Sequence, residues 1–182
     1  MALAKAKPNA LNYASNGSGS ITYLAAELLK KMMGINITEV AYKGAGPSLT
    51  ALLAGEVQLM IAPLGPSVPY VRADRLEAIG VPSASRSPLF PELPTLAESG
   101  LSGYEAINWY GVAAPAGTSE KIVRILNASV NRELQSADVR QRFSELGYVP
   151  TPTTPQAFGL YVRAEMQKWA STLKTVGKAP AD

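Results

Sequence analysis

Residues 11–46 read LNYASNGSGSITYLAAELLKKMMGINITEVAYKGAG, and this stretch indicates the fold class most directly. It predicts a short strand over residues 11–15, a glycine-rich turn, a helix from Ile21 and a second strand over residues 35–42. Apolar residues of the helix recur at i, i+3, i+4, i+7 and i+11, which places them on one stripe. They are Ile21, Leu24, Ala25, Leu28 and Met32. The stretch is therefore typical of a strand–helix–strand unit.

The same alternation continues downstream. Pro47 suits the first turn of a second helix. Residues 57–61 indicate a short strand of the kind that is buried on both faces, and a brief helix over residues 66–72 and another buried strand over residues 76–81 follow. The first eighty or so residues thus predict an α/β fold with an open, doubly wound and mostly parallel sheet.

The rest of the chain changes character. A turn-rich connection precedes an extended run over residues 104–114, and helices follow, the last from about residue 155 to 176. The apolar positions of the first two of these helices are Ile122, Ile125, Leu126, Val130, Val139, Phe143 and Leu146. This part has too few strands for its own sheet. We therefore expect residues 1–105 to form a complete α/β domain, and residues 106–182 to be the mostly helical portion of a second, incomplete one.

Composition excludes several classes of function. The 182 residues include no cysteine and no histidine, which excludes thiol nucleophiles, disulfides, Ser–His pairs and thiolate or imidazole metal sites. The formal charge of +3 is spread evenly, without a basic cluster interleaved with aromatic residues, so we predict no nucleic-acid partner. No run of eighteen apolar residues occurs, so no membrane span is predicted. We predict no metal, no cofactor and no catalytic residue.

The loop Ser15-Asn16-Gly17-Ser18-Gly19-Ser20 lies at the carboxyl end of a predicted strand and opens a helix. Open α/β sheets bind ligands at that position. Free N–H groups and the positive end of the helix dipole favour an anion there. The loop is neither a P-loop, because no Gly-Lys-Ser/Thr follows, nor a dinucleotide fingerprint, because a third glycine is missing. The alternative is a turn with a serine N-cap and no ligand.

A second loop, Lys43-Gly44-Ala45-Gly46, follows the next predicted strand. Lys43 would bring a cation to the same edge of the sheet as the first loop. The alternative is a lysine exposed to solvent without a ligand.

Short motifs over nearly the whole chain together resemble the tripartite tricarboxylate transporter substrate-binding proteins, also called Bug-type receptors. The motifs are LNYAS-x-G-x-GS (residues 11–20), LA-x-EL (24–28), YKGA (42–45), L-x-G-x-V (53–57), RSP (86–88), PT-x-x-E-x-G (94–100), GYE (103–105), WYG-x-x-APAG (109–117) and E-x-x-KW (165–169). The resemblance implies a type II periplasmic-binding fold, in which two α/β lobes enclose a cleft. Residues 1–105 would be the second lobe, and residues 106–182 would return to a first lobe whose opening segment is missing.

The resemblance also implies a ligand site. The loop from Ser15 to Ser20 would bind a carboxylate, mostly through the backbone amides of Gly17–Ser20. We expect Tyr23 and Lys43 to bind the ligand as well. Tyr23 stands where the family usually has histidine, and Ala41 where it usually has proline. The pair Ala62-Pro63 is apolar where many members carry a polar or acidic residue. These differences leave the identity of the acid open.

The resulting hypothesis is a non-catalytic, periplasmic solute-binding protein that captures a small organic carboxylate for the membrane permease of a tripartite tricarboxylate-type transporter. One alternative is an enzyme on a similar scaffold, with Lys43, Tyr42 or Ser20 as nucleophile or base. Another is the ligand-sensing domain of a regulator. No signal peptide is visible, and residues 1–8 are typical of the end of a helix, so we expect the natural chain to be longer. We also expect self-association, because the stripes of the C-terminal helices lack a sheet to pack on.

Overall fold

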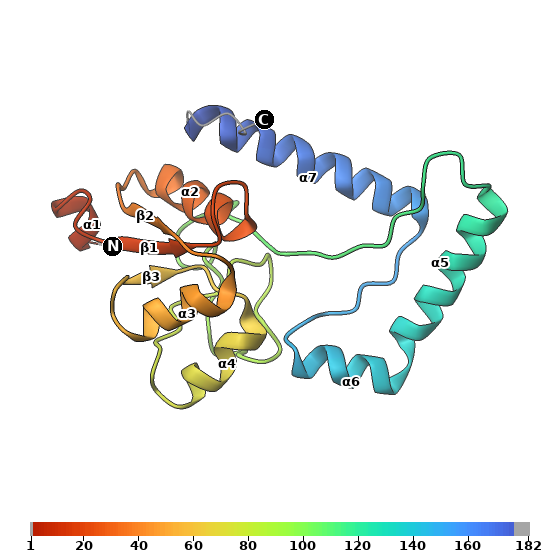
Figure 1. Ribbon diagram of the computed structural model, residues 1–182, viewed down its shortest axis with the longest axis horizontal. Coiled ribbons are helices and arrows are strands. Elements are labelled where there is room, and N and C mark those ends of the chain that lie inside the picture. Colours follow the sequence, from red (N-terminus) through yellow and green to blue (C-terminus); the bar gives the residue numbers. More distant parts are fainter. Residues whose placement is uncertain (1, 177–182) are drawn as a thin grey trace. The chain divides into compact units, whose positions relative to one another are not determined.

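The structure is a computed structural model that describes residues 2–176 and divides into two compact units. The first unit comprises Met1–Asn108 and Ser171–Asp182, and the second comprises Trp109–Ala170. The expected α/β fold with a parallel sheet is confirmed, and the sheet belongs to the first unit (Figure 1).

Three parallel strands form this sheet in the order β2-β1-β3. They are β1 (Asn12–Ser15), β2 (Thr38–Ala41) and β3 (Leu59–Met60). The helices of the unit are α1 (Ala2–Ala6), α2 (Ile21–Met33), α3 (Ala45–Leu53) and α4 (Leu64–Arg72). In the register of the sheet, Asn12 is paired with Thr38 and Ser15 with Ala41. Apart from shifts of a few residues at their ends, these elements are the predicted ones.

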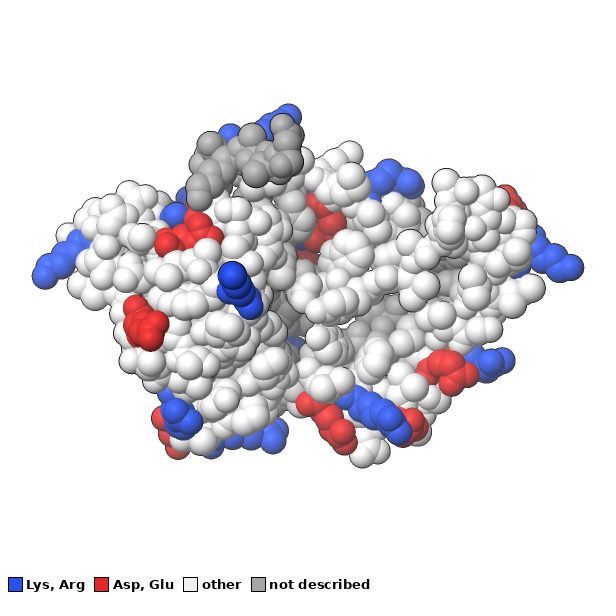
Figure 2. Space-filling model, in the orientation of Figure 1, with Lys and Arg blue, Asp and Glu red and all other residues white. Residues whose placement is uncertain are grey.

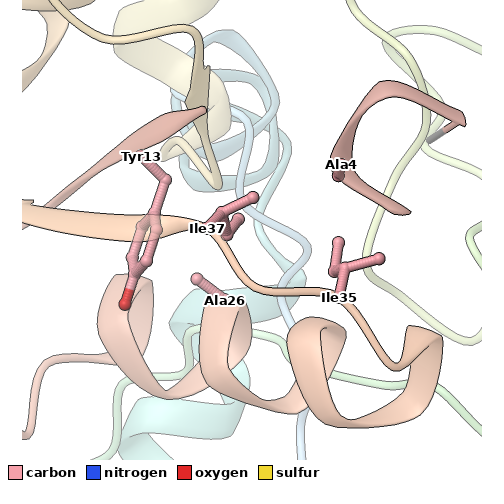
Figure 3. Packing of buried hydrophobic residues seen from close by; sticks show 5 residues of the cluster. All are labelled: Ala4, Tyr13, Ala26, Ile35 and Ile37. Carbon is pink, nitrogen blue, oxygen red and sulfur yellow. The ribbon is translucent and has the colours of Figure 1, made fainter. Parts of the chain in front are cut away.

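Both faces of the sheet are covered, as the doubly wound prediction requires. On one face, Tyr13 of β1 packs with Ala26 of α2 and with Ile35 and Ile37, and Ala4 of α1 completes the cluster (Figure 3). On the other face, Ala14 packs with Ala51 of α3. Neighbouring residues of β1 thus enter opposite layers of the core, because successive side chains of a strand point to opposite faces.

Helix α2 has a signal at each end. Ser20 is its N-cap, and the Ser20 hydroxyl accepts a hydrogen bond from the Tyr23 N–H. Gly34 ends the helix in the left-handed region, with φ 61°, and its N–H donates to the carbonyl groups of the last turn. Both ends agree with the sequence.

The predicted strand over residues 76–81 is wrong. Within this segment only Val81 forms a bridge, a parallel one with Thr95. The Val81 N–H donates to Pro94 O (3.0 Å), and the Val81 carbonyl accepts from the Leu96 N–H (3.0 Å). Ile79 is 68% exposed and Val81 is buried, so burial is confined to the end of the segment. Val81 thus pairs with the later connection instead of extending the sheet beside β3, which is only two residues long.

The connection after Val81 is held by local polar contacts. Glu98 accepts hydrogen bonds from the Thr95 N–H (2.8 Å) and from Arg86 Nε (2.9 Å). The Thr95 hydroxyl in turn accepts from the Glu98 N–H (3.0 Å). Further on, the buried Tyr104 hydroxyl donates to Ala25 O (2.8 Å), which ties this segment to α2.

The second unit is helical. It contains α5 (Glu120–Gln135), α6 (Ala137–Glu145) and the greater part of α7 (Pro155–Val176), whose residues from Ser171 on belong to the first unit. Residues 104–114, predicted as an extended run, form no strand and join no sheet. Asn127 and Asn131 of α5 each donate to Thr153 O at 2.9 Å. The rings of Phe158 and Tyr161 pack edge-on against Trp109, each with its centroid 5.6 Å from that of the indole.

The apolar stripe of α5 lies on the surface. Ile122, Ile125, Leu126 and Val130 are between 38% and 56% exposed. The helix contacts the segment around Thr153 through Asn127 and Asn131, which lie on another side of α5 than the apolar stripe. Few of the large side chains of α5 are therefore protected from water.

Candidate functional site

The loop between Ser15 and Ser20 begins at the end of the central strand β1 and leads directly into α2. The chain passes from β1 to β2 on one side and then to β3 on the other, so the strand order reverses at β1. In open α/β sheets, ligands bind outside the carboxyl ends of the strands at such a reversal. The loop and the residues after β3, among them Ala62 and Pro63, flank this point.

Three of the predicted site residues make their hydrogen bonds within the protein. Ser15 has no exposed surface, and its hydroxyl donates to Glu39 Oε1 (2.6 Å) and accepts from the Gly17 N–H (3.0 Å). Ser20 donates through its N–H (3.1 Å) and its hydroxyl (2.7 Å) to Gly17 O. The Gly17 and Ser20 amides, which we expected to bind the ligand, are thus already bonded.

Ser18 and Gly19 form the exposed tip of the loop. Their N–H groups donate no hydrogen bond to any residue that the structure describes. Gly19 has φ +83°, a conformation that favours glycine. Both residues directly precede the N-terminus of α2, where the helix dipole is positive. Within the loop, these two amides are the groups best placed to donate to an anion.

Asn16 is held from both sides. Its N–H donates to Thr22 Oγ1 (2.9 Å), and its side-chain Oδ1 lies within hydrogen-bonding distance of Ser48 Oγ (3.1 Å). The fully buried Ser48 hydroxyl also lies within hydrogen-bonding distance of Ser15 O (3.3 Å) and Gly44 O (2.9 Å). Ser48 therefore joins the two predicted loops.

Sequence reasoning missed Ser48, Thr22 and Glu39. Each is a common polar residue within an otherwise ordinary helix or strand, and no local pattern distinguishes it. The atoms of Ser15 and Asn16 that they contact lie between 6 and 33 residues away in the chain. Only the position of Ser48 in the first turn of a helix that follows the second loop could have drawn attention to it.

Tyr23 and Lys43 have opposite surroundings. Tyr23 is 1% exposed, so its side chain lies in the core under α2. Lys43 is exposed, and its ammonium group forms no ion pair with any described residue. Contact of either side chain with a ligand stays a prediction.

The tyrosines near the sheet are not activated as bases. Burial and then the hydrogen bond to Glu27 (2.6 Å) raise the pKa of Tyr13 far above its ordinary value. Partial burial and then Glu56 raise the pKa of Tyr42. A raised pKa keeps a phenol protonated at neutral pH, whereas a nucleophile or base would require the opposite shift.

The charge distribution, the possible metal ligands and the character of the helices bear on other classes of site. On the face that Figure 2 shows, Lys and Arg are interspersed with Asp and Glu. Within residues 2–176, no three acidic side chains are grouped in a way that could hold a metal ion. None of the described helices combines the length and the apolar character that crossing a membrane requires.

Comparison with known proteins places these features in a family. The sequence model of the family described as "Tripartite tricarboxylate transporter family receptor" matches residues 1–178. Protein BugT of Bordetella pertussis is 35% identical over 177 residues, which cover 97% of this chain and 54% of BugT. The chain thus spans about half the length of that relative.

Two solved structures are similar throughout. The structure titled "R. palustris Rpa4515 with adipate" has a TM-score of 0.88 and 38% identity, with coverage of 99% of this chain and 60% of that one. MatC from Rhodopseudomonas palustris, with bound malate, has a TM-score of 0.77 and 37% identity, with coverage of 90% and 56%. Adipate and malate are both small dicarboxylates.

Proposed function

We propose, from the premise that the chain belongs to the tripartite tricarboxylate transporter receptor family, that it is part of a receptor for a small organic carboxylate. The bound acid would be passed to the membrane permease of the transporter, and the protein would act in the periplasm. The adipate and malate of two similar structures support this class of ligand.

The observation that carries the proposal is the tip of the glycine loop. The Ser18 and Gly19 amides lie at the N-terminus of α2, beside the point where the strand order of the sheet reverses. A carboxylate placed there would accept two hydrogen bonds from backbone donors, and charge-assisted bonds of this kind are the stronger ones. Lys43 would add a cation from the second loop.

The proposal includes no catalysis. A receptor needs only to bind and release, and the family is a family of receptors. The raised pKa of Tyr42 and the internal hydrogen bonds of the Ser20 hydroxyl argue against the enzyme hypothesis, because both groups would be poor nucleophiles.

We further propose that the two units correspond to the lobes of a type II periplasmic-binding fold. The sheet-containing unit would be the second lobe, and the helical unit would be a portion of the first. Two observations support this proposal. One unit contains the sheet and the other is helical, and the chain is similar to 60% of the Rpa4515 chain with a TM-score of 0.88.

Titration of the ¹⁵N-labelled chain with adipate, malate and citrate tests the ligand site. We expect the amide signals of Ser18 and Gly19 to shift in a saturable way, and Gly19→Ala to weaken binding about tenfold, because its Cβ strains the loop. Gly34→Ala is the matched control, since Gly34 also has positive φ and open space but lies at the far end of α2. Binding of no acid, or equal weakening by both variants, would contradict the site.

A further inference from the structure

A hydrogen-bond relay connects strand β2 to the glycine loop. Ser15 Oγ donates to Glu39 Oε1 at 2.6 Å, and the Gly17 N–H donates to the same Oγ at 3.0 Å. Ser15 has no exposed surface, so water cannot replace either bond. The relay crosses from β1 to β2 on the face of the sheet that also carries Tyr13, which is paired with Glu39 in the register.

The direction of this relay follows from the number of hydrogens. A hydroxyl has one hydrogen to donate and two lone pairs with which to accept. The Glu39 carboxylate takes the hydrogen in a short, charge-assisted bond, and the lone pairs of Ser15 Oγ are left for the Gly17 N–H. Without the carboxylate, the hydroxyl could donate to a carbonyl of the loop, and the Gly17 amide would lose its oriented acceptor.

We propose that Glu39 is a positioning residue for the carboxylate site. Acting through Ser15, it holds the Gly17 amide inward at φ +95°, and this turn presents the Ser18 and Gly19 amides outward. The inference rests on the function proposed above for the loop. It also assigns Ser15, which the sequence placed among the ligand contacts, to the support behind them.

The charge of Glu39 makes the inference sharply testable. A negative charge close to an anion site by itself weakens anion binding. If charge were its only effect, removal of Glu39 would strengthen binding of a dicarboxylate. If Glu39 positions the loop, its removal weakens binding in spite of the lost repulsion.

Affinity for adipate provides the first test. We expect Glu39→Leu to weaken binding about tenfold, the equivalent of one charge-assisted hydrogen bond. Glu39→Gln keeps an acceptor oxygen without the charge, and we expect its affinity to equal or exceed that of the native chain. Glu56→Leu removes an acidic group that accepts a hydrogen bond from Tyr42, and it controls for net charge. Unchanged or tighter binding by Glu39→Leu would overturn the inference.

A second measurement needs no ligand. In the free protein, Glu39→Leu and Ser15→Ala should both shift the Gly17 amide signal and speed its hydrogen exchange, whereas Glu56→Leu should not. Circular dichroism would establish that each variant is folded. If the native chain bound no acid, the proposed function would fail and the Gly17 amide would still decide the relay. A Gly17 amide unchanged in folded Glu39→Leu would refute it.

Discussion

At the scale of single residues, hydroxyl groups near the glycine loop support the backbone. Serines in such a loop are natural candidates for ligand contacts. Here, however, the Ser15 hydroxyl donates its hydrogen to Glu39, and the Ser20 hydroxyl donates to Gly17 O. Ser48 does the same from a neighbouring helix. The side chains thus shape the loop, and the backbone N–H groups at its tip remain for an anion.

Ser48→Ala should destabilise the protein more than an equivalent serine elsewhere. Ser48 and Ser67 are both buried in the first turns of helices, and each donates to the carbonyl four residues earlier. Only Ser48 also lies within hydrogen-bonding distance of Ser15 O and Asn16 Oδ1. Without Ser48, Ser15 O would keep the hydrogen bond from the Tyr42 N–H (2.9 Å), whereas Asn16 Oδ1 would lose its contact with the hydroxyl. We expect urea unfolding to show a loss of about 1–3 kcal/mol for Ser48→Ala and about 0.5–1.5 kcal/mol for Ser67→Ala.

Equal losses in the two variants would mean that the bonds from Ser48 to the first loop contribute nothing. The native-like far-UV signal of both variants would serve as the control for correct folding.

At the scale of elements, local capping contacts define the ends of segments. The Thr95–Glu98 exchange of two hydrogen bonds is the capping-box arrangement. Arg86 adds an ion pair to the same carboxylate. The PT-x-x-E-x-G motif and the RSP motif therefore meet in one turn, which these contacts close.

The pKa of Glu98 predicts a pH dependence for this turn. Its pKa is lowered from 4.5, first by the hydrogen bond from the Thr95 N–H and then by Arg86. Because the folded state lowers the pKa, the stabilisation is present above the unfolded value and is lost as the pH falls through the folded one. We expect Glu98→Gln to be less stable than the native chain at neutral pH, and the difference to shrink below pH 4.5.

The urea midpoint of each chain, measured from neutral to acidic pH, checks this expectation. Glu92→Gln is the control, because Glu92 is exposed and forms no hydrogen bond or ion pair with a described residue. A difference between native and Glu98→Gln that stays constant across the acid range would contradict the assignment.

At the scale of the whole molecule, the stripe of α5 is an apolar surface in water. About half of each apolar side chain in the stripe is exposed, at Ile122, Ile125, Leu126 and Val130. Covering one such side chain contributes on the order of 1 kcal/mol. A stripe of this kind favours association with the same helix of a second copy.

We therefore expect the mass from light scattering to rise with protein concentration. Replacing Ile125 and Leu126 together with lysine should keep the chain monomeric, because a charge on the stripe would have to be desolvated. Ala128→Lys, on the opposite side of α5, should leave association unchanged. A native chain that is monomeric at every concentration would refute this prediction.

The sequence by itself determined the features that depend on neighbours within one or two turns. The stripe of α2, its serine cap and its terminal Gly34 were all predictable, because helix periodicity and capping are local. The same holds for the alternation of strands and helices, from which the doubly wound sheet follows. Many short motifs together also predicted the family, and the match to the family's sequence model confirms that prediction.

Only the tertiary structure decided which groups of the loop are available. The Ser15 hydroxyl is taken by a residue 24 positions away, and Ser48 reaches the loop from more than 30 positions away. The predicted strand over residues 76–81 does not form, and Val81 alone pairs with Thr95 instead of joining the sheet. Strand pairing and buried hydrogen bonds depend on which distant segments meet. A residue pattern indicates the conformation that a segment prefers, but it does not identify the segment with which it pairs.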